Sequence, residues 1–179
     1  PAQAARELDV VFVGHVLPIH ARRRALLDRL RARFRLEERQ GVFGEDMARL
    51  YARAKVVFNC SLAGDLNMRV FEGLASGALV VTDRIQNGLE GLFASGEHLL
   101  AYDDRSLEDV LASALADDAR RVEIAGRGQR LALLHHTYLQ RARQLLRVVR
   151  ANANQSARAP VSRARHPALV AVGGQGTGP

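Results

Sequence analysis

Short apolar runs alternate with longer amphipathic stretches along most of the chain. Three runs are predicted to be buried strands, at residues 9–15 (DVVFVGH), 55–61 (KVVFNCS) and 78–83 (ALVVTD). Residues 34–39 (FRLEER) and 98–102 (HLLAY) are weaker strand candidates. Because strands that alternate with helices form βαβ units, the pattern predicts an α/β fold with a parallel sheet flanked by helices.

The stretches between these runs have apolar residues at helical spacing. Residues 21–33 (ARRRALLDRLRAR) and 68–76 (MRVFEGLAS) each predict a helix, the second ended by a glycine. Another helix is expected to begin at Glu45, because acids in the first turn suit the helix dipole. The remaining helices are predicted within residues 106–150, with Ser106 as the N-cap of the first.

Composition refines the class of protein. With 179 residues, 47% hydrophobic and 25% charged, the chain suits a soluble globular protein with one domain at residues 1–150. Residues 151–179, rich in Ala, Gly and Pro, are predicted to be a disordered tail. The absence of a signal peptide, of a long apolar run and of any cysteine besides Cys60 favours a cytoplasmic protein without an integral membrane segment. Since it begins at Pro1, we expect part of a longer protein.

Charge patterning and missing motifs argue against several functions. The net charge is +7, but most charges alternate in sign along predicted helices, as on solvated faces, and no aromatic residues interleave with the arginines. We therefore expect no nucleic-acid partner; an arginine-rich binder confined to the tail is the weaker alternative. No Cys–His spacing predicts a metal site. Neither a Walker lysine nor a G-x-G-x-x-G motif is present, which disfavours a P-loop NTPase or a dehydrogenase.

One predicted helix carries an acid and a base within an apolar segment. Arg69 and Glu72 lie three residues apart and project from one helix face, just after the strand of residues 55–61. The carboxyl edge of a parallel sheet, where helix N-termini point, favours an anion. A carboxylate can accept hydrogen bonds from a ribose diol, and an arginine suits a diphosphate. The pair indicates a nucleoside diphosphate site, although a plain Arg69–Glu72 ion pair explains the same residues equally well.

The stretch of residues 59–93 (NCSLAGDLNMRVFEGLASGALVVTDRIQNGLEGLF) resembles the C-terminal domain of the CgeB-like group of family 4 glycosyltransferases. Three later pieces, SGEHLLAYDD, LADDARRVEIAGRGQR and HHTYLQRARQLL, follow in the same order as in that group, so the resemblance covers about residues 9–146. It implies one Rossmann-like half of a two-domain GT-B enzyme, the half that holds the nucleotide-sugar donor. The acceptor-binding half is expected to precede Pro1, so this fragment alone should be inactive.

The resemblance assigns the central roles to residues of the same segment. Glu72 matches the second of two acids spaced eight apart, the one that holds the ribose hydroxyls. The first acid falls at Gly64, which has no side chain, so Asp65 or Asn67 is the candidate substitute. Arg69 is expected to stabilise the departing diphosphate. Arg69 and Glu72 are therefore the predicted catalytic residues.

Further donor-binding residues are expected at the same edge of the sheet. Gly14 matches a glycine turn close to the donor phosphates. A basic residue follows that turn in the family, and Arg23 is chosen for it from a run of three arginines. Gly41 begins the loop that flanks the nucleobase. The remaining candidates are His15, Thr82 and Asn87, whereas Asp83 is interpreted as a helix cap.

The activity implied by the resemblance is transfer of a sugar from a nucleoside diphosphate sugar to the hydroxyl of an unknown acceptor, with retention of configuration and without a metal or other cofactor. The alternative is a non-catalytic Rossmann-like module that binds a nucleotide or a protein partner in bacterial envelope or spore assembly. Gly64, where the family has an acid, favours this alternative.

Overall fold

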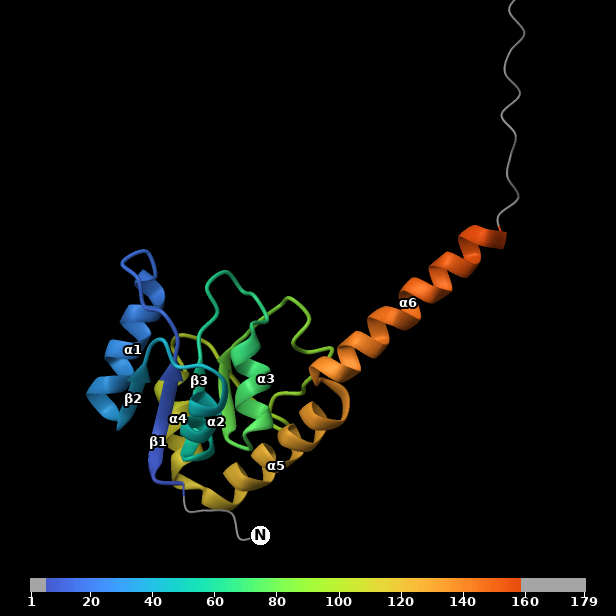
Figure 1. The fold of residues 1–179 in the computed structure, drawn as a ribbon. Coiled ribbons are helices and arrows are strands. Elements are labelled where there is room, and N and C mark those ends of the chain that lie inside the picture. The colour runs from blue at the N-terminus through green and yellow to red at the C-terminus, as the bar shows by residue number, and fades with distance from the viewer. Residues whose placement is uncertain (1–5, 159–179) are drawn as a thin grey trace, which may run out of the picture. The chain divides into compact units, whose positions relative to one another are not determined.

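The computed structural model describes residues 6–158 of the chain, with side chains as far as residue 153. A parallel sheet of five strands forms the centre of this part (Figure 1). The strands follow the order β2-β1-β3-β4-β5 across the sheet, and every neighbouring pair is parallel. Their bounds are β1 (Leu8–Val13), β2 (Leu36–Arg39), β3 (Ala54–Asn59), β4 (Leu79–Asp83) and β5 (Leu100–Tyr102). The predicted α/β class and all five predicted strands are confirmed.

Helices connect the strands and follow the last of them. In the described residues they are α1 (Ala21–Arg33), α2 (Gly44–Ala52), α3 (Met68–Ala75), α4 (Leu107–Ala116), α5 (Asp118–His135) and α6 (Tyr138–Arg158). Ser106 occupies the predicted N-cap position of α4, but its hydroxyl does not cap the helix. Its hydroxyl accepts from the backbone N–H of Asp103 at 3.0 Å and makes no cap bond to α4. The hydroxyl is occupied by this local turn and therefore does not bond to the backbone N–H groups at the start of α4.

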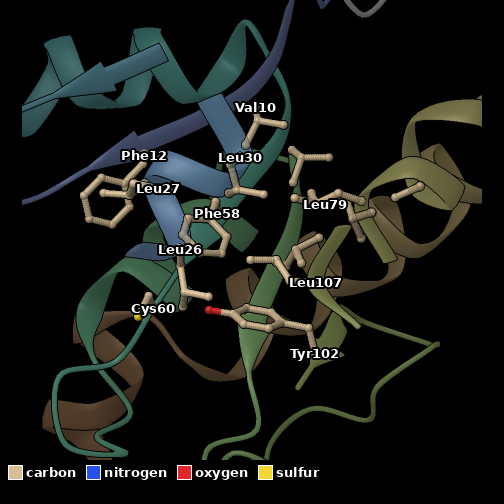
Figure 2. Packing of buried hydrophobic residues seen from close by; sticks show 14 of the residues in the cluster. Val10, Phe12, Leu26, Leu27, Leu30, Phe58, Cys60, Leu79, Tyr102 and Leu107 are labelled. Carbon is tan, nitrogen blue, oxygen red and sulfur yellow. The ribbon is translucent and has the colours of Figure 1, made fainter. Parts of the chain in front are cut away.

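Two apolar clusters bury the two faces of the sheet. Helices α1, α4 and the first part of α5 cover one face, where the rings of Phe12, Phe58 and Tyr102 follow one another with centroids 6.1 and 5.6 Å apart (Figure 2). Helices α2 and α3, the end of α5 and residues 84–99 cover the opposite face. Successive strand residues alternate between the clusters, as the two-residue repeat of a strand requires.

Glycines allow helices to approach this core closely. A Cβ atom on Gly73 of α3 would lie 2.8 Å from Cγ2 of Val80 in β4. A Cβ atom on Gly128 of α5 would lie 2.2 Å from the carbonyl oxygen of His98. A larger residue therefore does not fit at either position, and α3 packs directly against the sheet.

The chain divides after Arg141 into two compact units, and most of α6 belongs to the second. Helix α6 extends into the predicted tail as far as Arg158, and residues 159–179 lie outside the described residues, so the disorder of the tail stays a prediction. The predicted domain limits stay a prediction. Within residues 6–158, no helix combines the length and apolar character that crossing a membrane requires.

Candidate functional site

A cavity of about 500 Å³ lies at the carboxyl edge of the sheet, and we call it the edge cavity. It is bordered by the end of β1, the loop after β3, the start of α3, and residues 41–51 with helix α2. Eight of the ten predicted donor-binding residues line it: Gly14, His15, Arg23, Gly41, Asp65, Asn67, Arg69 and Glu72. The structure thus brings together residues that are far apart in sequence, while their roles in binding stay a prediction.

Arg69 reaches from α3 across the ends of two strands. Its Nε donates to the carbonyl oxygen of Val13 at 2.6 Å, and its Nη1 donates to Oδ1 of Asn59 at 2.6 Å. The guanidinium also lies over the ring of Phe12, 4.6 Å from the centroid. A Cβ atom on Gly14 would lie 2.3 Å from Nη2, so this glycine leaves the space that Arg69 occupies. Burial lowers the pKa of Arg69, yet an arginine stays cationic in proteins.

Glu72 lies on the same helix, partly buried at the wall of the edge cavity. No ion pair in the part of the chain with described side chains joins it to Arg69, whose Nε and Nη1 donate to Val13 and Asn59 instead. The alternative of a plain Arg69–Glu72 ion pair is therefore wrong. Burial raises the pKa of Glu72, and the nearby charge of Arg69 opposes that rise. A carboxylate without an ion-pair partner is available to a ligand.

The loop before α3 holds the two candidates for the missing first acid. Oδ1 of Asp65 accepts from the backbone N–H groups of Leu62 at 3.0 Å and Ala63 at 3.2 Å. Burial opposes the charge of Asp65, but these hydrogen bonds outweigh it and lower the pKa. Asn67 occupies the N-cap position of α3 without a side-chain cap bond, and its Oδ1 is buried without a partner. Gly64 is exposed with φ of +71°, a conformation in which a side chain is strained.

Arg23 is the inward-facing member of the arginine run. Its side chain is 5% exposed and donates to the carbonyl oxygens of His15 at 2.9 Å and Cys60 at 2.7 Å, which joins the loops after β1 and β3. The neighbouring Arg22 turns away and pairs with Asp83 at 3.0 Å and with Asp104 at 2.6 Å. The choice of Arg23 therefore agrees with its placement at the edge cavity.

The three candidates in and after β4 do not line the edge cavity. Thr82 is fully buried, accepts from Nδ2 of Asn59 at 2.9 Å and does not line the edge cavity. Asn87 is exposed in a turn outside the cavity. Asp83 caps no helix: it accepts from the N–H of Ser61 at 3.0 Å, from the Ser61 hydroxyl at 2.5 Å and from Arg22. Thr82 and Asp83 thus link the ends of β3 and β4, and the donor-binding roles of Thr82 and Asn87 stay predictions that their placement does not support.

Sequence reasoning placed the loop that begins at Gly41 near the ligand but missed the contribution of α2. Val42, Phe43, Met47 and Tyr51 line the edge cavity. Met47 and Tyr51 are four residues apart, a spacing that could have predicted a shared helix face. Tyr51 is 1% exposed, its hydroxyl is buried without a partner, and burial raises its pKa to about 12. The spacing alone does not show that this face meets a cavity.

A second cavity of about 420 Å³ lies among β5, α4 and α5, and we call it the helix cavity. It contains none of the predicted donor-binding residues. One of its charged residues, Arg121, is already occupied by Asp118 and by the carbonyl oxygen of Ala114. We therefore take the edge cavity as the candidate site.

Comparison with known proteins connects this geometry to a family. The family described as "Glycosyl transferase-like" matches residues 2–147. Anabaena HepE, solved with UDP and glucose, is similar in structure with a TM-score of 0.66 and 16% identity over 80% of this chain and 48% of HepE. Sucrose-phosphate synthase from Thermosynechococcus elongatus has a TM-score of 0.66 and 17% identity over 84% of this chain and 47% of the synthase.

A variant of TarM from S. aureus, solved in complex with UDP and other ligands, has a TM-score of 0.62 and 11% identity over 82% of this chain and 36% of TarM. The chain thus spans about half the length of HepE and of the synthase. Among curated proteins, none matches the chain. At these identities the structural similarity establishes the fold.

Proposed function

The chain belongs to the glycosyl transferase-like family, and we propose that its edge cavity binds the nucleoside diphosphate sugar of a GT-B glycosyltransferase. The observation that carries this proposal is the placement of Glu72. Its carboxylate lies at the cavity wall, on the helix that begins at the carboxyl edge of a parallel sheet, and no ion pair of the described side chains involves it. In open α/β sheets this edge is where ligands bind.

The edge cavity has suitable side chains both for the ribose and for the diphosphate of such a ligand. The two oxygens of Glu72 can accept hydrogen bonds from the vicinal hydroxyls of a ribose. The diphosphate suits the cation of Arg69 and the N-terminus of α3, which no side chain caps. Arg23 adds a second positive charge at the cavity. As the bond to the sugar breaks, these groups stabilise the charge that grows on the diphosphate.

We propose UDP as the first nucleotide to test, because HepE and TarM are described as complexes with UDP. The motif of residues 59–93 supports placing the chain in the CgeB-like group. We further propose a bacterial, cytoplasmic enzyme that transfers the sugar with retention and without a bound metal. Since the chain spans about half of HepE, we propose that an N-terminal half supplies the acceptor site and that this fragment is inactive.

The alternative is a module that binds a nucleotide or a protein partner without catalysis. One observation favours it: Gly64 occupies the place of the family's first acid, and its φ of +71° shows a loop built for glycine. Binding of a nucleotide alone is compatible with both interpretations. Measurable sugar transfer by the protein extended to its natural N-terminus would exclude the alternative.

The proposed function is tested by isothermal titration calorimetry with UDP, GDP and their sugars. We expect one of them to bind, and Glu72→Ala to weaken that binding by about 1–3 kcal/mol, the scale of a lost charged hydrogen bond. Glu97→Ala, which removes an exposed acid outside the edge cavity, is the matched control and should bind like the wild type.

Two results would count against the proposal in different ways. If none of the nucleotides or nucleotide sugars binds to the protein extended to its natural N-terminus, the donor site is excluded. If a nucleotide binds but Glu72→Ala binds it equally well, the site remains and the role of Glu72 is lost.

A further inference from the structure

Unpaired polar atoms gather at the edge cavity. Three buried side-chain polar atoms in the described side chains lack a hydrogen-bond partner, namely Nε of Arg23, the Tyr51 hydroxyl and Oδ1 of Asn67. All three residues line the edge cavity. Burying an unpaired polar group is unfavourable, and native structures contain few of them. Their concentration in one cavity indicates that a ligand supplies the missing partners.

The hydroxyl of Tyr51 is the most informative of the three. Tyr51 is 1% exposed and packs within the apolar cluster that also contains Val57 and Val70. Arg69 lies near enough to act on the hydroxyl oxygen of Tyr51 as a weak hydrogen-bond donor, and Glu72 acts on it through its charge, but no hydrogen bond of good geometry forms, and an arginine cannot accept the hydroxyl proton. Because burial raises its pKa to about 12, the phenol is protonated at neutral pH and can donate a hydrogen bond.

A second buried tyrosine shows what a purely structural hydroxyl does in this fold. Tyr102 is also 1% exposed, and its hydroxyl donates to the carbonyl oxygen of Asn59 at 3.1 Å (Figure 2 shows its place in the core). Buried tyrosine hydroxyls generally find such a partner. The hydroxyl proton of Tyr51 has no acceptor at hydrogen-bond geometry, although Tyr51 is equally buried. Packing alone therefore does not explain why position 51 carries a hydroxyl.

We propose that Tyr51 is a further donor-binding residue, whose hydroxyl donates a hydrogen bond to an oxygen of the bound nucleoside diphosphate. This inference rests on the proposed function of the edge cavity. The position of the contact follows from the two neighbouring charges: Glu72 is assigned to the ribose and Arg69 to the diphosphate. The oxygen that Tyr51 contacts therefore belongs to the part of the nucleotide where the ribose joins the phosphates.

The test is Tyr51→Phe in the complete chain, which removes one oxygen atom. Without ligand, we expect the melting temperature to rise by about 2–4 °C, because an unpaired buried hydroxyl is removed. In calorimetry with UDP, we expect the affinity to fall by about 5- to 20-fold, the effect of one lost hydrogen bond. Only a ligand-directed hydroxyl predicts both a more stable protein and weaker binding.

The matched control is Tyr102→Phe, the same chemical change at equal burial. It leaves the carbonyl oxygen of Asn59 without its partner, so the melting temperature should fall while the affinity for UDP stays within about twofold.

The results of the calorimetry and of the melting experiments separate this inference from the proposed function. If the wild type binds UDP and Tyr51→Phe binds it equally well, this inference is overturned and the proposed function stands. If Tyr51→Phe lowers the melting temperature as Tyr102→Phe does, the hydroxyl has a partner within the protein, and the inference is overturned. If the wild type binds no nucleotide, the inference falls together with the proposed function.

Discussion

The partners of Arg69 explain why a helix that packs against the sheet carries a base. Its Nε and Nη1 donate hydrogen bonds to the ends of β1 and β3, and the ring of Phe12 lies beneath the guanidinium. Gly14 provides the space for this arrangement. Arg69 thus holds two strand ends in place while its charge remains at the edge cavity. Glu72, one helical turn further along, is left without an ion pair, and its carboxylate is partly desolvated.

This desolvation predicts a pH dependence of stability. Because burial raises the pKa of Glu72 above 4.5 in the folded protein, the folded state binds this proton more strongly than the unfolded state does. The resulting stabilisation is complete below pH 4.5 and is lost as the pH rises through the raised pKa. We therefore expect Glu72→Gln to be more stable than the wild type at pH 7, and this difference to shrink towards pH 4. Urea unfolding at both pH values measures it.

The control for this experiment is Glu97→Gln, which removes one negative charge at an exposed position outside the edge cavity. Any effect of net charge appears in both variants. A Glu72→Gln protein that is no more stable than the wild type at pH 7 would show that the carboxylate is not desolvated.

At the scale of elements, the alternation of strands and helices was predictable, because buried parallel strands appear as short apolar runs. Helix capping and the pairing of side chains were not predictable from the sequence. The prediction that Asp83 caps a helix failed because its partner Arg22 is 61 residues away in sequence, and no local pattern shows that contact. Ser106 does occupy the predicted N-cap position, but its hydroxyl bonds to Asp103, only three positions away, instead of to the helix. Local propensity cannot decide between such competing partners.

Close packing of α5 gives a prediction at the same scale. A Cβ atom on Gly128 would lie 2.2 Å from the backbone oxygen of His98, so Gly128→Ala should destabilise the protein by about 1–3 kcal/mol through overpacking. Gly126→Ala is the matched control on the same helix, where the nearest atom to a new Cβ, on the Arg130 side chain, is 3.5 Å away. It should stabilise the protein by up to about 1 kcal/mol, because alanine favours helix.

Urea unfolding of the two variants compares them directly. If Gly128→Ala were as stable as Gly126→Ala, α5 could shift to accommodate a methyl group, and the close contact would not determine how α5 packs.

At the scale of the whole molecule, the site is assembled from segments that the topology brings to one edge of the sheet. The rule for parallel sheets and the family resemblance together predicted eight of the residues that line the cavity. Thr82 lies at the same edge, yet its side chain turns inward to Asn59, which sequence position alone does not reveal. Tyr51 was missed because its significance lies in an absent hydrogen bond, which only the folded structure shows.

We expect the edge cavity to hold a nucleoside diphosphate with its ribose against Glu72, and a crystal structure of the chain soaked with UDP would show this contact. We predict UDP in the edge cavity, with the ribose hydroxyls about 2.6–3.2 Å from the carboxylate of Glu72 and the diphosphate beside Arg69 and the start of α3. UDP bound elsewhere, for example in the helix cavity among β5, α4 and α5, or bound with Glu72 facing only water, would contradict the claim.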